Sequence, residues 1–285
     1  MEITNKLNLP EPFVRFAERQ HHRKSDYSAT ELIKSPRQVL LKQRHSGNIK
    51  KDVSDLVWAL FGTAVHKVIE GGEGENELSE GYFLEEIGGK MISGTMDHYT
   101  SDGVISDWKT CSVYKILNGD FKDWEQQLNI YAYLAKKAGF DVTGIQVVAI
   151  MRDWLRRKAK FDARYPEHQM SVITFNLWTE REQLEFIKQK VSKLIQAENL
   201  ADEDLPFCTP EERWAKEGLW KVYKNKSAKR AVTGGLYAES AKEKAQEHAD
   251  KIGGEIRFIE GEPWTACEYC DAVDFCNQTK LKESK

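Results

Sequence analysis

Residues 94–110 read GTMDHYTSDGVISDWKT, and this stretch decides the fold. Two runs of β-type residues, 90–100 and 104–110, flank the turn signal Ser101-Asp102-Gly103. Short β-type runs on both sides of such a signal are typical of a β-hairpin. The stretch therefore predicts two antiparallel strands joined by a tight turn.

The length of this turn determines which side chains face each other across the hairpin. Asp107 and Lys109 are two residues apart on the second strand, so they point to the same face. A three-residue loop with a left-handed Gly103 sets Asp97 opposite Asp107, whereas a two-residue turn sets Asp97 opposite Trp108. The first register holds two carboxylates with Cβ atoms roughly 5 Å apart, which is destabilising without a cation. Magnesium is commonly held by one or two such carboxylates. Two solvated acids on an exposed sheet face are the plain alternative, and the hairpin by itself leaves both readings open.

Helix and strand patterns on both sides of the hairpin predict the rest of the core. A helix is expected over 53–70, because Trp58, Gly62, Val65 and Ile69 recur at spacings of three and four and make one packed stripe. Further elements are a helix over 121–137, a buried strand over 147–151, a strand over 172–178, and a helix that Thr179 and Glu182 open and that ends near 199. The fold class that follows is α/β.

The bulk composition limits the function classes. A chain of 285 residues with 40 % hydrophobic content can form one large domain with a small lobe. The sequence has no apolar run of membrane-helix length, and its first ten residues lack a signal-peptide pattern, so a cytoplasmic protein is expected. The net charge of −3 excludes a chain coated in basic residues. Nucleic-acid binding would therefore need a local basic patch.

Cysteines bracket the C-terminal segment. Cys208 lies near its start, and Cys267, Cys270 and Cys276 lie near its end. Structural disulfides are rare in a reducing cytoplasm, so metal binding is the better explanation for clustered cysteines. A metal clasp also suits a lobe that is too small to bury much core of its own. We expect two domains, residues 1–205 and a cysteine-bracketed α+β lobe over 206–285.

Four short motifs follow one another in the first domain: Gly62-Thr63-Ala64-Val65-His66, Gly94-Thr95-Met96-Asp97, Asp107-Trp108-Lys109 and Gln127-Leu128-Asn129-Ile130-Tyr131. Their order and spacing resemble the PD-(D/E)XK nuclease superfamily, specifically its RecB-like branch. The resemblance implies a restriction-endonuclease-like core, with a mixed central β-sheet flanked by helices, in which the metal ligands are His66, Asp97 and Asp107. It further implies that Lys109 contacts the attacking water or the scissile phosphate, and that Gln127 and Tyr131 orient the site or contact the strand being cut.

His66 depends on this resemblance for its role. A single histidine at the edge of an apolar helix stripe is, by itself, more often a packed and hydrogen-bonded residue than a ligand. Imidazole is a softer ligand than oxygen, so its presence beside two carboxylates admits Mn²⁺ as well as Mg²⁺. The sequence does not choose between the two metals.

The resemblance also implies an activity. We expect a DNA exonuclease that acts on single strands or DNA ends in phage or bacterial replication, recombination or repair, with partner proteins from those processes. A structure-selective endonuclease and a non-catalytic nucleic-acid-binding accessory subunit are the alternatives. The set of His66, Asp97, Asp107 and Lys109 is intact, which argues against the accessory subunit.

The pattern Cys267-x2-Cys270-x5-Cys276 resembles the C-terminal cysteines of RecB-like nucleases that carry an iron–sulfur cluster, such as the CRISPR-adaptation exonucleases and the AddAB-type helicase–nucleases. Four thiolates are the usual ligand count for a cluster, and Cys208 is the expected fourth, with Cys111 in reserve. In those relatives the first cluster cysteine precedes the nuclease motifs, whereas Cys208 follows them. Zinc is the main alternative, although only one C-x2-C pair exists. Packed free thiols are the second alternative.

Two basic patches are candidates for nucleic-acid binding. The first contains Arg152, Arg156 and Arg157, with Trp154 among them, and the second contains Lys224, Lys226 and Arg230, near Trp220 and Tyr223. Basic residues interleaved with aromatic ones suit a groove that neutralises phosphates and stacks unpaired bases. A solvated charged face is the alternative for each patch. We expect one of the two to contact the substrate.

Overall fold

The protein is described by a computed structural model that covers residues 1–19, 24–72 and 74–280. It divides into two compact units. Unit 1 comprises residues 1–36 and 46–199, and unit 2 comprises residues 37–45 and 200–285. The second unit thus includes a segment from the N-terminal part of the chain. Within the described residues, no helix is long and apolar enough to cross a membrane.

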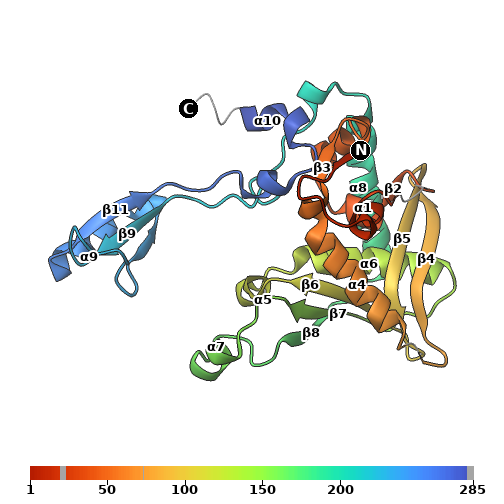
Figure 1. Ribbon diagram of the computed structural model, residues 1–285, viewed down its shortest axis with the longest axis horizontal. Helices are drawn as coiled ribbons and strands as arrows, with labels where there is room; N and C mark the ends of the chain where they lie inside the picture. Colours follow the sequence, from red (N-terminus) through yellow and green to blue (C-terminus); the bar gives the residue numbers. More distant parts are fainter. Residues whose placement is uncertain (20–23, 73, 281–285) are drawn as a thin grey trace. The chain divides into compact units, whose positions relative to one another are not determined.

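Unit 1 is built on a six-stranded mixed sheet (Figure 1). Its strands are β2 (Tyr27–Ser28), β4 (Leu78–Ile87), β5 (Lys90–Tyr99), β6 (Val104–Cys111), β7 (Gly144–Met151) and β8 (Met170–Phe175). The order is β2-β5-β6-β7-β8, and β4 also pairs with β5. The β2–β5 and β6–β7 pairs are parallel, and the other pairs are antiparallel. Because β6 and β7 are parallel, their carboxyl ends lie at the same edge of the sheet.

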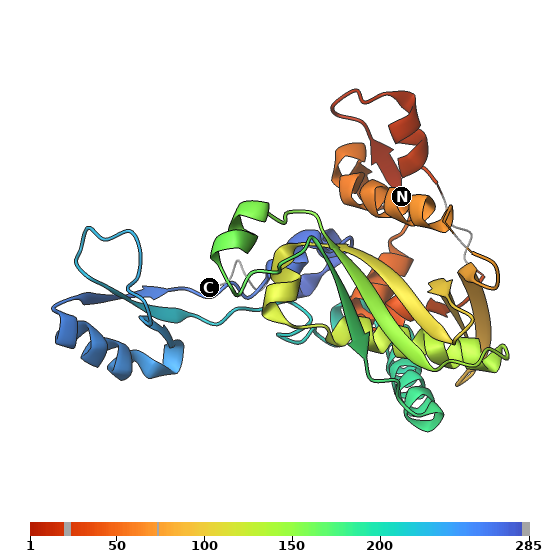
Figure 2. The ribbon, with the colours of Figure 1, turned by 90° about the horizontal axis from the view of Figure 1, so that it is seen from below.

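Helices cover this sheet. In α6 (Lys122–Lys137) the residues 127–135 are all buried, and the helix contacts β5, β6 and β7 as well as α8 (Glu180–Glu198). The α8 helix begins at a capping box of Thr179 and Glu182, as predicted. Helix α4 (Val57–Glu70) contacts β6, and Figure 2 shows α4 and α8 on opposite sides of the sheet. The predicted α/β class, with a mixed central sheet flanked by helices, is confirmed and is consistent with a restriction-endonuclease-like core.

The hairpin of β5 and β6 has the three-residue turn. His98 pairs with Ser106 and Tyr99 pairs with Ile105, and the amide of Thr100 donates to the Val104 carbonyl at 3.1 Å. Gly103 has a φ of +89°, and a Cβ there would lie 2.5 Å from the Asp141 carbonyl oxygen, so only glycine fits. Counting back along both strands sets Asp97 opposite Asp107. The register that the metal hypothesis requires is confirmed.

The expected helix over 53–70 differs from the structure in two respects. Residues 53–56 form the 3₁₀ helix η1 (Val53–Leu56), and α4 begins only at Val57. The predicted packed stripe is wrong, because no residue of α4 is buried and Trp58 keeps 55 % of its surface exposed. The spacing of apolar residues shows which side chains share a face, but it does not show that another element covers that face.

Shorter elements complete unit 1. Strands β1 (Glu2–Thr4) and β3 (Lys50–Asp52) pair in parallel, and Asp52 then caps η1. Ser28 and Glu31 form the capping box of α2 (Ala29–Leu32). The remaining helices are α1 (Glu11–Ala17), α5 (Val113–Asn118) and α7 (Arg156–Phe161). The last two follow the carboxyl ends of β6 and β7 in the chain.

Unit 2 combines α3 (Pro36–Arg44), from Arg37 onward, with the C-terminal segment. Strands β9 (Leu219–Tyr223), β10 (Leu236–Ala238) and β11 (Glu255–Ile259) form an antiparallel sheet in the order β10-β9-β11, and α9 (Lys242–Ile252) packs on it. The buried residues of this packing are Val222, Ala245 and Ala249. The short helices η2 (Asp202–Asp204), η4 (Thr265–Tyr269), η5 (Val273–Phe275) and α10 (Asn277–Lys280) lie in the segments before and after it.

Candidate active site

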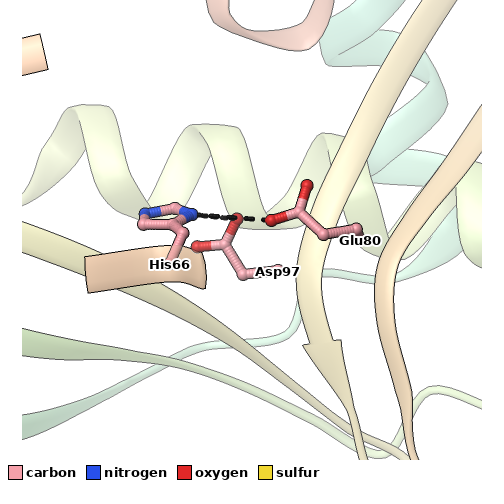
Figure 3. A group of neighbouring side chains, drawn as sticks. All are labelled: His66, Glu80 and Asp97. Carbon is pink, nitrogen blue, oxygen red and sulfur yellow. Dashed lines mark ion pairs between the residues drawn. The ribbon is translucent and has the colours of Figure 1, made fainter. Parts of the chain in front are cut away.

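His66 lies on α4 with its two ring nitrogens directed at different partners. Nε2 lies 3.1 Å from the Trp108 carbonyl oxygen, and Nδ1 lies 3.4 Å from Asp97 Oδ1 and 3.7 Å from Glu80 Oε1 (Figure 3). A carbonyl oxygen only accepts hydrogen bonds, so this contact places a ring proton on Nε2. When the ring is neutral, the lone pair of Nδ1 faces two carboxylates. A neutral imidazole held in this way is suited to ligate a metal.

Asp97 projects from β5 into the same place and is buried. Its Oδ2 accepts a hydrogen bond of 2.7 Å from the backbone amide of Trp108, so β6 holds the carboxylate of the neighbouring strand. Burial, and then the negative charge of Asp107, raise the pKa of Asp97 to about 7. The charged form of Asp97 is thus costly here unless a cation lies beside it.

Glu80 is the residue that the sequence did not predict. On β4, Ser79 pairs with His98 and Gly81 pairs with Met96, so Glu80 occupies the register position opposite Asp97. Its backbone has a φ of +53°, which is unfavourable for a residue other than glycine. Non-glycine residues held at positive φ gather at functional sites. Three acids, Glu80, Asp97 and Asp107, therefore follow one another across the adjacent strands β4, β5 and β6.

Asp107 and Lys109 form an ion pair on β6. Lys109 Nζ lies 2.6 Å from Asp107 Oδ2, and Asp107 retains only 2 % of its surface exposed. That oxygen accepts no well-oriented hydrogen bond among the described residues, so lone-pair directions remain for a cation. Burial alone would lower the pKa of Lys109, but the Asp107 carboxylate outweighs this and raises the pKa above its ordinary value. Lys109 is therefore charged at neutral pH.

Gln127 and Tyr131 reach the site from α6, where both are buried. Gln127 Nε2 donates to the Tyr131 hydroxyl at 2.5 Å, and Thr30 Oγ1 lies 3.4 Å from the same nitrogen. Gly94 makes room for the Tyr131 ring on β5, because a Cβ at Gly94 would lie 2.9 Å from ring atom Cδ1. Burial, and then the Asp107 charge, raise the pKa of Tyr131 to about 12, so its hydroxyl stays neutral.

The donor set fits a divalent metal. Within the described residues, one nitrogen of His66 and one carboxylate oxygen each of Glu80 and Asp97 lie within 4.8 Å of one another. Asp107 contributes a buried carboxylate beside them. One imidazole with several carboxylates suits Mn²⁺ or Mg²⁺, which take mostly oxygen ligands. The group adds Glu80 to the predicted ligands His66 and Asp97, whereas the third predicted ligand, Asp107, lies outside the group.

The cysteines lie in different units. Cys208, Cys267, Cys270 and Cys276 line a single cavity of unit 2. Cys208 is held there by Gln278, whose side chain accepts a hydrogen bond from the Cys208 amide at 2.9 Å and donates to its carbonyl at 3.0 Å. Cys111, the reserve ligand, is the last residue of β6 in unit 1. The structure thus places Cys208, the fourth ligand that the sequence favoured, at the same cavity as the other three cysteines.

Helix α3 contributes a charged residue to this cavity. The Arg37 side chain is buried, and its Nη1 donates to Cys276 Sγ at 3.7 Å and to Asn277 Oδ1 at 2.6 Å. Further guanidinium hydrogen bonds go to the carbonyls of Pro206 and Leu205. Four sulfur donors with a nearby cation fit a metal or metal–sulfur cluster.

The predicted nucleic-acid-binding residues are all exposed. Arg152 follows β7, and Arg156 and Arg157 open α7, all in unit 1. Lys224, Lys226 and Arg230 lie in the segment after β9 in unit 2. Arg257 of β11 donates to the carbonyls of Ala228, Asn225 and Lys226 and so holds that segment in place.

Comparison with known proteins finds similarity at the level of solved structures. No protein-family model matches the chain, and no curated protein matches it. The protein SSO0001 is similar, with 19 % identity and a TM-score of 0.45 over 63 % of this chain and 81 % of the other. The alkaline exonuclease LHK-Exo from Laribacter hongkongensis has 13 % identity and a TM-score of 0.35 over 59 % of this chain and 87 % of its own.

Proposed function

We propose that the protein is a metal-dependent nuclease that hydrolyses the phosphodiester backbone of DNA. The observation that carries the proposal is the convergence of His66, Glu80 and the buried Asp97 beside the Asp107–Lys109 ion pair. Buried carboxylates that face one another are costly without a cation, and phosphoryl transfer is the chemistry for which carboxylate-held divalent metals are suited. The resemblance to RecB-like nucleases rests on the same residues.

In this proposal His66, Asp97 and Asp107 hold Mg²⁺ or Mn²⁺, and Glu80 completes the set. A divalent metal bound there lowers the pKa of a coordinated water and offsets the negative charge of the scissile phosphate. The protein contributes the orientation of the ligands. The Trp108 backbone holds both the Asp97 carboxylate and the His66 ring, so neither has to reorganise when a metal binds.

Lys109 acts on the substrate in this proposal. Its ammonium group remains charged, and it lies on the same face of β6 as Asp107. A fixed positive charge there stabilises the negative charge that develops on the phosphoryl oxygens. Gln127 and Tyr131 act as positioning residues. The neutral Tyr131 hydroxyl accepts a hydrogen bond from Gln127 and orients the groups next to the Asp107–Lys109 ion pair.

The substrate is inferred to be DNA with single-stranded character or free ends, and the mode exonucleolytic. The exposed basic residues Arg152, Arg156 and Arg157 lie beyond the carboxyl end of β7, at the sheet edge where Lys109 lies near the end of β6. Such residues neutralise phosphates close to the reacting one. A structure-selective endonuclease remains the second candidate. The biological setting that we propose is phage or bacterial replication, recombination or repair.

Unit 2 is proposed to carry an iron–sulfur cluster on Cys208, Cys267, Cys270 and Cys276, with zinc as the alternative. The four side chains around one cavity support a four-thiolate site, and the buried Arg37 guanidinium, which contacts Cys276 Sγ, places a positive charge beside it. We propose that the cluster stabilises this lobe. The division into a nuclease core and a cysteine lobe, 1–205 and 206–285, belongs to the same proposal.

End-labelled DNA tests the activity and its mode together. Single- and double-stranded oligonucleotides, labelled at the 5′ or the 3′ end in turn, are incubated with Mg²⁺, Mn²⁺ or EDTA. We expect metal-dependent release of short products from one end, with 5′-phosphate and 3′-hydroxyl termini. Internal fragments from branched DNA would support the endonuclease instead. Labelled DNA that stays intact with either metal would contradict the nuclease proposal.

A further inference from the structure

Helix α4 carries exposed aromatic side chains near its start, before the metal-ligand candidate His66. Trp58 and Phe61 expose 55 % and 42 % of their surfaces, and their rings meet edge to face with centroids 6.4 Å apart. Exposed aromatic clusters of this kind are unfavourable in water and mark surfaces that bind a ligand. A ligand that stacks on these flat apolar rings must itself have a flat apolar face.

Arg152 adds a positive charge to this surface. Its guanidinium lies 4.1 Å from the centroid of the Trp58 ring. Its backbone is fixed, because the Arg152 amide donates to the Cys111 carbonyl at 3.0 Å and the next residue, Asp153, accepts hydrogen bonds of 2.7 Å from Ser112 Oγ and from the Val113 amide. Arg152 is an exposed residue. The surface therefore combines stacking area with a cation, which matches the bases and phosphates of a nucleic-acid strand.

The aromatic surface is aligned with the metal site. Trp58, Gly62 and His66 are each four residues apart and so lie along one face of α4. This face of α4 lies along the C-terminal end of β6. His66 contacts the Trp108 carbonyl, a Cβ at Gly62 would lie 3.8 Å from Thr110 Oγ1, and the Arg152 beside Trp58 bonds to Cys111. The helix therefore follows β6 from the metal site to the end of the strand.

The distance along this path fits a few nucleotides. Eight residues of helix separate Trp58 from His66, which is about 12 Å at 1.5 Å per residue. Stacked nucleotides rise about 3.4 Å each, so about 12 Å corresponds to three or four of them. A strand whose scissile phosphate lies at the metal site thus reaches Trp58 with a base three or four positions away.

We propose that Trp58, Phe61 and Arg152 form a stacking platform for unpaired bases of the strand being cut. The inference rests on the proposed nuclease function and adds the state of its substrate. Trp58 and Phe61 stack on bases of any sequence, and Arg152 neutralises an adjacent phosphate. In a duplex the base faces are covered by their stacked neighbours, and pairing holds the bases in the stack, so the platform selects single-stranded DNA over duplex DNA.

The test measures binding rather than cutting. A fluorescent single-stranded oligonucleotide and a blunt duplex of the same length are titrated in EDTA, and anisotropy reports the dissociation constants. Trp58→Ala is expected to weaken single-strand binding about tenfold, because stacking contributes about 1–3 kcal/mol per base. Duplex binding is expected to change less than twofold. Trp58→Phe keeps a ring and is expected to recover most of the affinity.

Two controls make the result specific. Trp214, in unit 2, exposes 60 % of its surface, so Trp214→Ala removes a tryptophan of matched exposure and is expected to bind like the parent. An abasic nucleotide three or four positions from the scissile phosphate is expected to weaken binding to the parent but not further to Trp58→Ala. Unfolding temperatures confirm that each variant is folded.

The outcomes separate this inference from the proposed function. If the parent cuts DNA and Trp58→Ala binds single strands as tightly as the parent, the platform is wrong and the nuclease proposal stands. Equal losses in Trp58→Ala and Trp214→Ala, or equal losses for single strands and duplexes, also overturn the platform. A parent protein that neither binds nor cuts DNA overturns both.

Discussion

The backbone amide of Trp108 donates a hydrogen bond of 2.7 Å to Asp97 Oδ2, so the main chain of β6 orients a carboxylate of β5. The carbonyl of the same residue lies 3.1 Å from His66 Nε2. Two metal-ligand candidates from different elements are therefore held by one peptide segment. Because both contacts are made by backbone groups, the orientation of Asp97 and His66 does not depend on the side chain at position 108.

This relationship predicts how two substitutions differ in metal binding. His66→Ala removes a ligand and is expected to lower the affinity for Mn²⁺ by about 10- to 100-fold or more, the range found when partners of a metal site are removed. Trp108→Phe keeps both backbone contacts and is expected to bind Mn²⁺ like the parent. Calorimetric titration measures both affinities. Parent-like binding by His66→Ala would exclude His66 as a ligand.

We expect Glu80 to contribute to metal binding at a cost in backbone conformational energy. Glu80→Gln removes the charge and is expected to weaken Mn²⁺ binding several-fold, whereas Glu86→Gln, an exposed acid on the same strand, is expected to leave it unchanged. Glu80→Gly relieves a backbone φ of +53°, so it is expected to lower metal affinity without lowering the unfolding temperature in EDTA. A Glu80→Gly protein that is clearly less stable and binds metal normally would show that Glu80 is structural.

The hydrogen bonds of Asp52 predict that the N-terminal part of unit 1 loses stability at acid pH. Hydrogen bonds from the Lys6 amide, and then from Ser54, hold the pKa of Asp52 well below its ordinary value. The folded pKa lies below the unfolded value of about 3.9, so the stabilisation is present above that pH and is lost as the pH falls below it. Asp52→Asn is therefore expected to be less stable than the parent at pH 6, with the difference shrinking below pH 4. Chemical unfolding at several pH values measures this, and two parallel stability profiles would contradict it.

The four cysteines around the unit 2 cavity are predicted to hold the metal, and Cys111 is not. Cys276→Ser is expected to lose most of its bound iron, or zinc, and to destabilise unit 2, because metal binding and folding are coupled in such lobes. Cys111→Ser is the matched control and is expected to keep the metal content of the parent. Elemental analysis and the visible absorbance of anaerobically purified protein report both. Full metal content in Cys276→Ser would remove that residue from the ligand set.

Local signals account for what the sequence could predict of the site. The turn at Ser101-Asp102-Gly103 is decided within a few residues, because only glycine fits the left-handed position beside the Asp141 carbonyl. That turn fixes the register of Asp97 and Asp107, and the period of a strand then places Lys109. The α8 helix start at Thr179 was predictable for the same reason, since a capping box needs only four residues.

Non-local contacts account for what the sequence could not predict. Glu80 joins the site through a pairing of β4 with β5 that no local signal shows. Arg37 reaches a cysteine 239 positions away in the chain. The exposure of Trp58 depends on what covers α4, and the apolar spacing of a helix carries no information about that.

The measurement that tests the central claim most directly compares the cleavage rates of Lys109→Ala, Asp107→Asn and the parent on labelled single-stranded DNA with saturating Mn²⁺. Lys115→Ala, which removes a lysine paired with Asp123 outside the site, is the control. We predict that Lys109→Ala and Asp107→Asn lose about 10²- to 10³-fold or more of the rate, as when a group that stabilises transition-state charge is removed, while Lys115→Ala cuts like the parent. Lys109→Ala and Asp107→Asn proteins that are folded and cut at the parental rate would contradict the assignment of this site.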